Sequence, residues 1–119
     1  MSSSNLAIRL TAEPLRTLAF GSISGTYAGI GTALANPSRI FWLQNLTDVS
    51  VLISLDGVND HIYLVSGEVF ILDNTSNKAN VGGALSFAQG TRFYAKDDGS
   101  APSSGQVTIS TFYGTGVDV

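Results

Sequence analysis

The feature that most constrains this chain is a block of four short apolar runs, separated only by turn-forming residues, within residues 38–73. The runs cover residues 39–46, 51–55, 61–65 and 68–72. In residues 51–55 every second side chain is a branched aliphatic one, which is the pattern of a strand with one buried face. No segment of the chain shows the repeat of an amphipathic helix. The block therefore predicts four β-strands.

The first run, residues 39–46, is apolar on both of its faces. Phe41 and Leu43 share one face, and Ile40 and Trp42 share the other. An apolar run without polar alternation is typical of a strand that is covered on both sides. One face would pack against an opposing sheet. The other, which carries either Trp42 or Phe41, would contact a neighbouring subunit.

Two dipeptides, Asp56-Gly57 and Ser66-Gly67, mark tight turns between the later runs. Glycine adopts positive φ without steric cost, and such turns usually join neighbouring antiparallel strands. We therefore expect the four strands to form a meander, in which each strand pairs with the next.

The rest of the chain supplies further strands, at residues 6–10, 17–23, 85–88, 91–96 and 106–113. About eight short strands with regularly spaced turn signals predict an all-β fold. We expect one domain over residues 1–119, an antiparallel β-sandwich with the jelly roll as a candidate topology.

Residues 1–15 stand apart from this body. Pro14 cannot donate a ladder hydrogen bond, so it interrupts the strand pattern that precedes it. Residues 1–15 would form either an N-terminal arm that reaches a neighbour or an edge strand of the same domain.

Charged residues are scarce, at 13% of the chain against roughly 25% in an average soluble domain. A free monomer of this size usually carries a mixed, charged surface. Either the chain is a Ser- and Thr-rich β-protein, or other subunits cover much of its surface.

The same composition bears on partners. The net charge is −3 and the six Lys and Arg residues are scattered, which argues against a nucleic-acid partner. No apolar run approaches the about 20 residues of a membrane helix, and we expect no signal peptide and no membrane partner. The chain has no cysteine, which fits synthesis in a reducing compartment.

One polar cluster could carry chemistry, because Asp56, Asn59, Asp60 and His61 lie within six residues. Their spacing does not match a calcium-binding EF-hand loop, and a histidine-based metal site needs several imidazoles where this chain has one. Turn formation accounts for Asp56 and Asn59 without a ligand. We predict no metal and no cofactor; a calcium ion held by carboxylates and carbonyls is the alternative.

The same histidine is a candidate catalytic residue. His61 could act as a general base, but the chain has no cysteine nucleophile. The run from Gly21 to Gly25 has Ile23 where a nucleophile elbow needs serine. We therefore predict that the protein is not an enzyme and has no catalytic residue.

The aromatic residues are the remaining candidates for a functional surface. Trp42 and the four tyrosines could stack on a sugar, anchor a subunit interface or simply fill the core. As interface residues we predict Tyr27, Phe41, Trp42 and Tyr113.

Five segments of the sequence together carry a resemblance to known proteins: F-W-L-Q-N-L-T-D, I-S-L-D-G-V-N-D-H, I-L-D-N-T-S-N-K, Q-G-T-R-F-Y-A-K and S-G-Q-V-T-I-S-T-F-Y-G. In these segments the chain resembles small virion proteins of tailed bacteriophages, over about residues 15–114. The likeness contains no site motif, so no functional residue is carried over.

This resemblance implies a β-sandwich that acts by assembly in the virion, as a capsid decoration or accessory protein, a neck (head–tail) component or a tail component. Its partners would be further copies of itself, in a homo-oligomer, and other virion proteins such as capsid, portal or tail proteins. Such proteins are made in the cytoplasm of the bacterial host. The alternative is a carbohydrate- or receptor-binding β-sandwich module of a phage tail.

Overall fold

The computed structural model describes residues 7–73 and 87–117. The strands are β1 (Ala7–Ala12), β2 (Arg16–Ala19), β3 (Ala28–Gly29), β4 (Ser38–Asn45), β5 (Val51–Ser54), β6 (Ile62–Leu64), β7 (Val69–Asp73), β8 (Tyr94–Asp97) and β9 (Gln106–Val117). Helical structure in the described part of the chain is limited to a 3₁₀ turn at Phe20–Ser22, where a continued strand was expected. The all-β prediction is confirmed.

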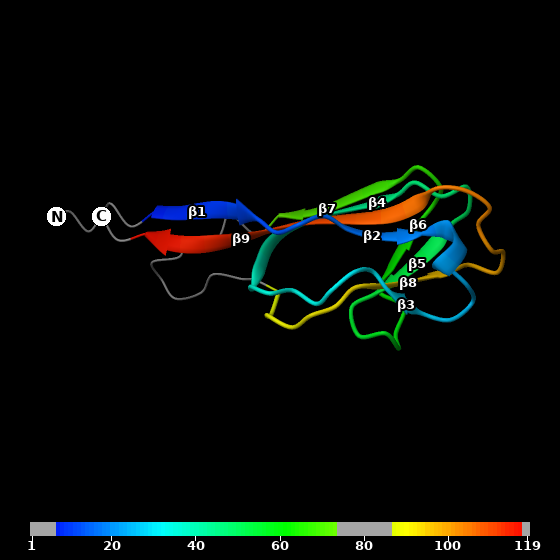
Figure 1. Cartoon of the computed structure of the whole chain (residues 1–119), viewed down its shortest axis with the longest axis horizontal. Coiled ribbons are helices and arrows are strands. Elements are labelled where there is room, and N and C mark those ends of the chain that lie inside the picture. The colour runs from blue at the N-terminus through cyan, green and yellow to red at the C-terminus, as the bar shows by residue number, and fades with distance from the viewer. Residues whose placement is uncertain (1–6, 74–86, 118–119) are drawn as a thin grey trace.

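The strands form two antiparallel sheets that pack against each other (Figure 1). The larger sheet has the order β1-β9-β4-β7, and β2 also pairs with β9, next to β1 along the same edge. The smaller sheet has the order β3-β8-β5-β6. The predicted two-sheet sandwich is therefore confirmed.

The strand pairs are nested, as in a long hairpin that has been rolled up. β5 pairs with β6, β4 with β7, β3 with β8, and β1 and β2 with β9. Successive pairs alternate between the two sheets, which is the jelly-roll topology.

Of the three neighbouring pairs in the predicted meander, the pairing of β5 with β6 is confirmed, whereas those of β4 with β5 and of β6 with β7 are wrong. β4 and β7 pair with each other in the larger sheet, whereas β5 and β6 pair in the smaller one. The turn at residues 65–68 does exist, with the Glu68 amide donating to the Val65 carbonyl at 3.0 Å and Gly67 at φ 83°. It carries the chain from one sheet to the other. A tight turn specifies that the chain reverses, and the packing of the sheets decides which strand it then pairs with.

The crossing from β4 to β5, which leads from the larger to the smaller sheet, is held by the buried side chain of Asn45, at the end of β4. Its Nδ2 donates to the carbonyls of Val49 (2.8 Å) and Leu64 (3.1 Å). Its Oδ1 accepts from the amide and the hydroxyl of Thr47. Both ends of the amide are thus satisfied inside the protein, as a buried polar group requires.

The core lies between the sheets, and Phe41 is at its centre. The Phe41 ring is 1% exposed and contacts the rings of Phe70, Phe87 and Phe93, with centroids 6.0, 4.9 and 5.1 Å away. The other fully buried apolar side chains come from both sheets. Phe41 is therefore a core residue. Its ring does not reach the surface of the chain, so it is not available to contact a neighbouring subunit.

Strand β9 extends beyond the sandwich. Its residues 106–109 pair with β2 and its residues 112–117 pair with β1, whereas β4 pairs with it only as far as Tyr113. The end of β9 and β1 thus form a two-stranded ribbon that projects from the body, and the molecule measures 57 × 23 × 20 Å (Figure 1). The sequence predicts that residues 1–15 form either an arm or an edge strand. Within this segment, β1 is an edge strand of the larger sheet. Residues 1–6 lie outside the described residues.

Candidate assembly surface

The outer face of the larger sheet, which points away from the smaller sheet, exposes several large apolar side chains. Residues that lie opposite each other in an antiparallel pair share a face of the sheet. Trp42 lies opposite Ile71 on one side and Ser110 on the other. By the same register, the outer face of β2, β4, β7 and β9 consists of Thr17, Ala19, Ile40, Trp42, Gln44, Val69, Ile71, Asp73, Gln106, Thr108, Ser110 and Phe112.

The part of this outer face formed by β4 and β7 is exposed. Trp42 is 42% exposed, Val69 is 42% and Ile71 is 53% exposed, whereas Phe41 and Leu43 on the inner side of β4 are buried. Of the two alternatives for the second apolar face of β4, the structure selects Trp42. The sequence predicts that this face is covered. In the single chain it is exposed to solvent.

The outer face also carries almost no charge. Of its twelve residues only Asp73 is charged, and it lies at the end of β7. The described acidic residues otherwise lie largely in loops and turns, where Asp48, Asp56, Asp60 and Asp98 are exposed. Exposed apolar side chains that adjoin one another are a usual mark of an interaction surface.

Tyr27 lies far from this face in the fold, just before β3 of the smaller sheet. Its hydroxyl donates to the Asp60 carboxylate, and the Lys96 ammonium lies 4.8 Å from the centre of its ring. Lys96 is also 3.4 Å from Asp60. Burial, the hydrogen bond to Asp60 and its charge raise the pKa of Tyr27. Tyr27 therefore belongs to a local cluster of its own.

Tyr113 lies at the root of the ribbon. It is opposite Thr11 of β1 and Ser38 of β4, and it is half-buried. The interface roles predicted for Tyr27, Trp42 and Tyr113 stay predictions, but the structure does not bring the three aromatic rings to one surface. The aliphatic neighbours of Trp42 on β7, Val69 and Ile71, could be found only once the pairing of β4 with β7 was known.

The Asp56 carboxylate is engaged in the turn that joins β5 to β6. Its Oδ1 accepts from the Ser54 hydroxyl and from the amides of Val58 and Asn59, each at 2.8 Å. Its Oδ2 accepts from the Asn59 side chain at 2.7 Å. These hydrogen bonds hold the pKa of Asp56 well below its usual range. The carboxylate acts here as the organising group of the turn.

His61 closes the same turn. Its Nδ1 accepts from the Leu55 amide at 3.0 Å, and its Nε2 lies 3.9 Å from Asp56 Oδ2. Across residues 7–73 and 87–117, no group of three or more acidic or histidine side chains is placed to hold a metal ion. The arrangement of this cluster is that of a hairpin turn.

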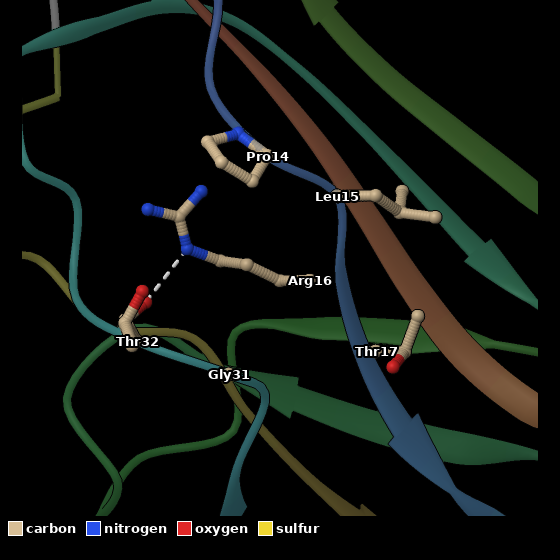
Figure 2. Close-up of a pocket in the computed structure, with 6 residues that line it drawn as sticks. All are labelled: Pro14, Leu15, Arg16, Thr17, Gly31 and Thr32. Carbon is tan, nitrogen blue, oxygen red and sulfur yellow. Dashed lines mark hydrogen bonds between the residues drawn. The ribbon is translucent and has the colours of Figure 1, made fainter.

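A buried ion pair lies where β1 passes into β2. Each nitrogen of the Arg16 guanidinium donates: Nη2 to Glu13 Oε1 (2.7 Å), Nη1 to the Thr111 hydroxyl (2.8 Å) and Nε to the Thr32 carbonyl (2.7 Å). Figure 2 shows the last of these bonds beside a shallow hollow of about 360 Å³, lined by Pro14, Leu15, Arg16, Thr17, Gly31 and Thr32. The Arg16 guanidinium that lines the hollow is already engaged in these hydrogen bonds.

The other carboxylate oxygen of Glu13 completes this network. Glu13 Oε2 accepts from the amide of Asn36 (2.9 Å) and from its side chain (3.0 Å). Burial raises the pKa of Glu13, but the hydrogen bonds from Arg16 and Asn36 and the charge of Arg16 outweigh this and hold it below its usual value. The network joins the root of the ribbon to the body of the sandwich.

No known protein family matches the sequence, and no curated protein or solved structure is significantly similar to it. Among the described residues, no helix is long and apolar enough to cross a membrane.

Proposed function

We propose that this protein is a non-enzymatic structural subunit of a tailed-bacteriophage virion, which assembles through subunit–subunit contacts as a capsid decoration or accessory protein or as a head–tail (neck) protein. One observation carries the proposal: the larger sheet exposes an almost uncharged apolar face centred on Trp42. Small proteins that act as free monomers rarely leave such a face in water.

The assignment to a phage particle is supported by the resemblance of the turn and strand phrases to small virion proteins. The jelly roll agrees with it, because viral capsid domains use this topology. Lectins and cupin enzymes use it too, so the fold alone does not select among these functions.

The proposal that the protein is not an enzyme is supported by the state of its polar clusters. The hydrogen-bonding atoms of Asp56, Glu13 and Arg16 are engaged in turns and in the network at the ribbon root. His61 accepts from a backbone amide. These groups stabilise the local chain conformation.

A sugar- or receptor-binding module of a phage tail is the second candidate, and the exposed Trp42 ring favours it. Gln44 and Ser110 lie beside Trp42 on the outer face and could donate to sugar hydroxyls. A glycan array probed with the wild-type protein and with Trp42→Ala tests this candidate. Wild-type binding that is lost in the variant would support it, and an array without signal would reject it.

The proposed function is tested on particles of the phage whose genome encodes this chain. We expect quantitative mass spectrometry of gradient-purified virions to find the chain at many copies per particle. Immunogold labelling would then place it on the head, the neck or the tail. A phage replication protein serves as the control for contamination. If the chain is abundant in the infected lysate but falls to the level of this control in purified particles, the proposal is rejected.

A further inference from the structure

The larger sheet has the properties of a surface that packs against itself. We infer that its outer face binds the same face of a second copy of this chain, so that two subunits pack with their larger sheets together around a two-fold axis. This inference rests on the proposed function, because it names the surface through which the subunit assembles.

Charge is the first argument for a second copy. In a two-fold interface every group near the axis meets its own symmetry mate, so a charge at the centre would face the same charge. Trp42 and Ser110 lie on the two inner strands, β4 and β9, and Ile71 lies beside Trp42 on the edge strand β7; all three are neutral. Asp73, the one charged residue of the face, lies at the end of β7, two residues beyond Ile71. A face with so little charge cannot attract an oppositely charged partner strongly, but it is compatible with itself.

Size is the second argument. At about 3.3 Å per residue and about 4.8 Å per strand, the eight residues of β4, a similar length of β9, the five residues of β7 and the four of β2 give a footprint of about 400 Å². The face continues onto the ribbon, because Ala12 lies opposite Phe112 and Leu10, which is 47% exposed, lies opposite Gly114. Two further strands over about four residues add about 100 Å². The total approaches the about 600 Å² per partner of the smaller specific interfaces.

The third argument is geometry. Two sheets pack face to face about 10 Å apart, with aliphatic and aromatic side chains filling the space between them. The outer face presents such side chains from adjacent strands, since Ile40, Trp42 and Ile71 lie on β4 and β7. A dimer of this kind would repeat between subunits the packing that closes the sandwich within each one.

The experiment uses Trp42 as its own probe, because it is the only tryptophan of the chain. Sedimentation velocity and tryptophan emission are measured over the same range of concentrations. We expect a dimer whose formation shifts the emission to shorter wavelength and reduces quenching by acrylamide, with one shared midpoint. The particle experiment tests the proposed function separately, so either result can fail while the other stands.

The decisive variant is Ile71→Lys, opposite Trp42, which places one lysine of each subunit inside the proposed apolar contact, where its charge would lose water. We expect it to raise the dimer dissociation constant on the order of 100-fold. The matched control is Tyr63→Lys, on β6 of the smaller sheet, because Tyr63 is 51% exposed and Ile71 is 53% exposed. The control should leave the dissociation constant unchanged, and circular dichroism shows that both variants are folded.

Several results would overturn the inference. One is a wild-type chain that stays monomeric at every concentration. Others are an oligomer that Ile71→Lys leaves intact, or one that forms while the Trp42 emission stays constant, since each would place the contact on another surface. An emission shift that appears only when purified capsid, portal or tail proteins are added would assign the face to one of those partners instead.

Discussion

The two faces of strand β4 are nearly equally apolar in the sequence, yet they lie in opposite environments. Phe41, on the inner face, is 1% exposed, and Trp42, its neighbour on the outer face, is 42% exposed. Two further aromatic rings close the inner face, Phe87 and Phe93, which lie in the segment before β8. An apolar face is expected to be buried. The connectivity of the sheets determines which of the two faces the chain itself buries.

The largest difference between the two faces should appear when each aromatic side chain is removed. We expect Phe41→Ala to lower the free energy of unfolding by about 3–5 kcal/mol, because it leaves a cavity among three phenylalanine rings. Trp42→Ala should cost the monomer only about 1–2 kcal/mol, because much of its ring already contacts water. Urea titration at low protein concentration, followed by far-UV circular dichroism, measures both. Equal costs would mean that the faces do not differ as described.

The next contrast concerns the polar neighbours Gln44 and Asn45. Asn45→Ala leaves the carbonyls of Val49 and Leu64 without their side-chain donor, and should cost about 3 kcal/mol. Gln44→Ala, on the outer face, loses one hydrogen bond from the Thr108 hydroxyl and should cost less than about 1 kcal/mol. Thermal unfolding of the two variants compares them directly. A Gln44 variant as unstable as the Asn45 variant would contradict this ordering.

The difference between the two faces also shows what the sequence can predict. Alternation and turn residues were sufficient for the all-β class and for most of the strands, because side-chain periodicity is local. They were insufficient for the pairing of β4 with β7, since the turn at Ser66-Gly67 looks the same whether the next strand joins the same sheet or the other. Pairing partners are a property of the whole sandwich.

The candidate surface was predictable to a similar extent. Trp42 was identified from its apolar strand, but the sequence could not separate it from Phe41, which depends on the side to which the smaller sheet packs. Ile71 and Val69 join Trp42 only through the register of β4 with β7. The network of Glu13 and Arg16 carried no signal, because its partners Asn36 and Thr111 are distant in the chain.

The same contrast of faces recurs on β2 and predicts a pH dependence. Arg16 points inward to Glu13, whereas Thr17 points outward. Because the folded-state pKa of Glu13 lies below its usual 4.5, its stabilising effect is complete above pH 4.5 and is lost as the pH falls through the folded-state value. Glu13→Gln should cost about 2 kcal/mol at pH 7, and the gap to wild type should narrow towards pH 3.

The control for Glu13 is the double variant Glu13→Gln/Arg16→Met. It removes both buried charges. Its loss of unfolding free energy should therefore be smaller than the sum of the losses in the single variants Arg16→Met and Glu13→Gln. Urea denaturation of the four proteins from pH 7 to pH 3 gives the cycle. A constant gap between wild type and Glu13→Gln over this range would show that the pair is not coupled to folding.

The smallest effect is expected at Asp56, whose hydrogen bonds are as complete as those of Glu13 but lie at the surface. Its folded-state pKa is below the usual 3.8, so its contribution is present above that pH and fades as the pH falls through the folded-state value. Solvent screens an exposed carboxylate, and Asp56→Asn should therefore change the melting temperature less than any variant above. The loss should instead be local, as faster hydrogen exchange at the amides of Val58 and Asn59, which donate to Asp56. If Asp56→Asn unfolds the protein globally, burial does not determine how much each polar cluster contributes to the stability of the fold.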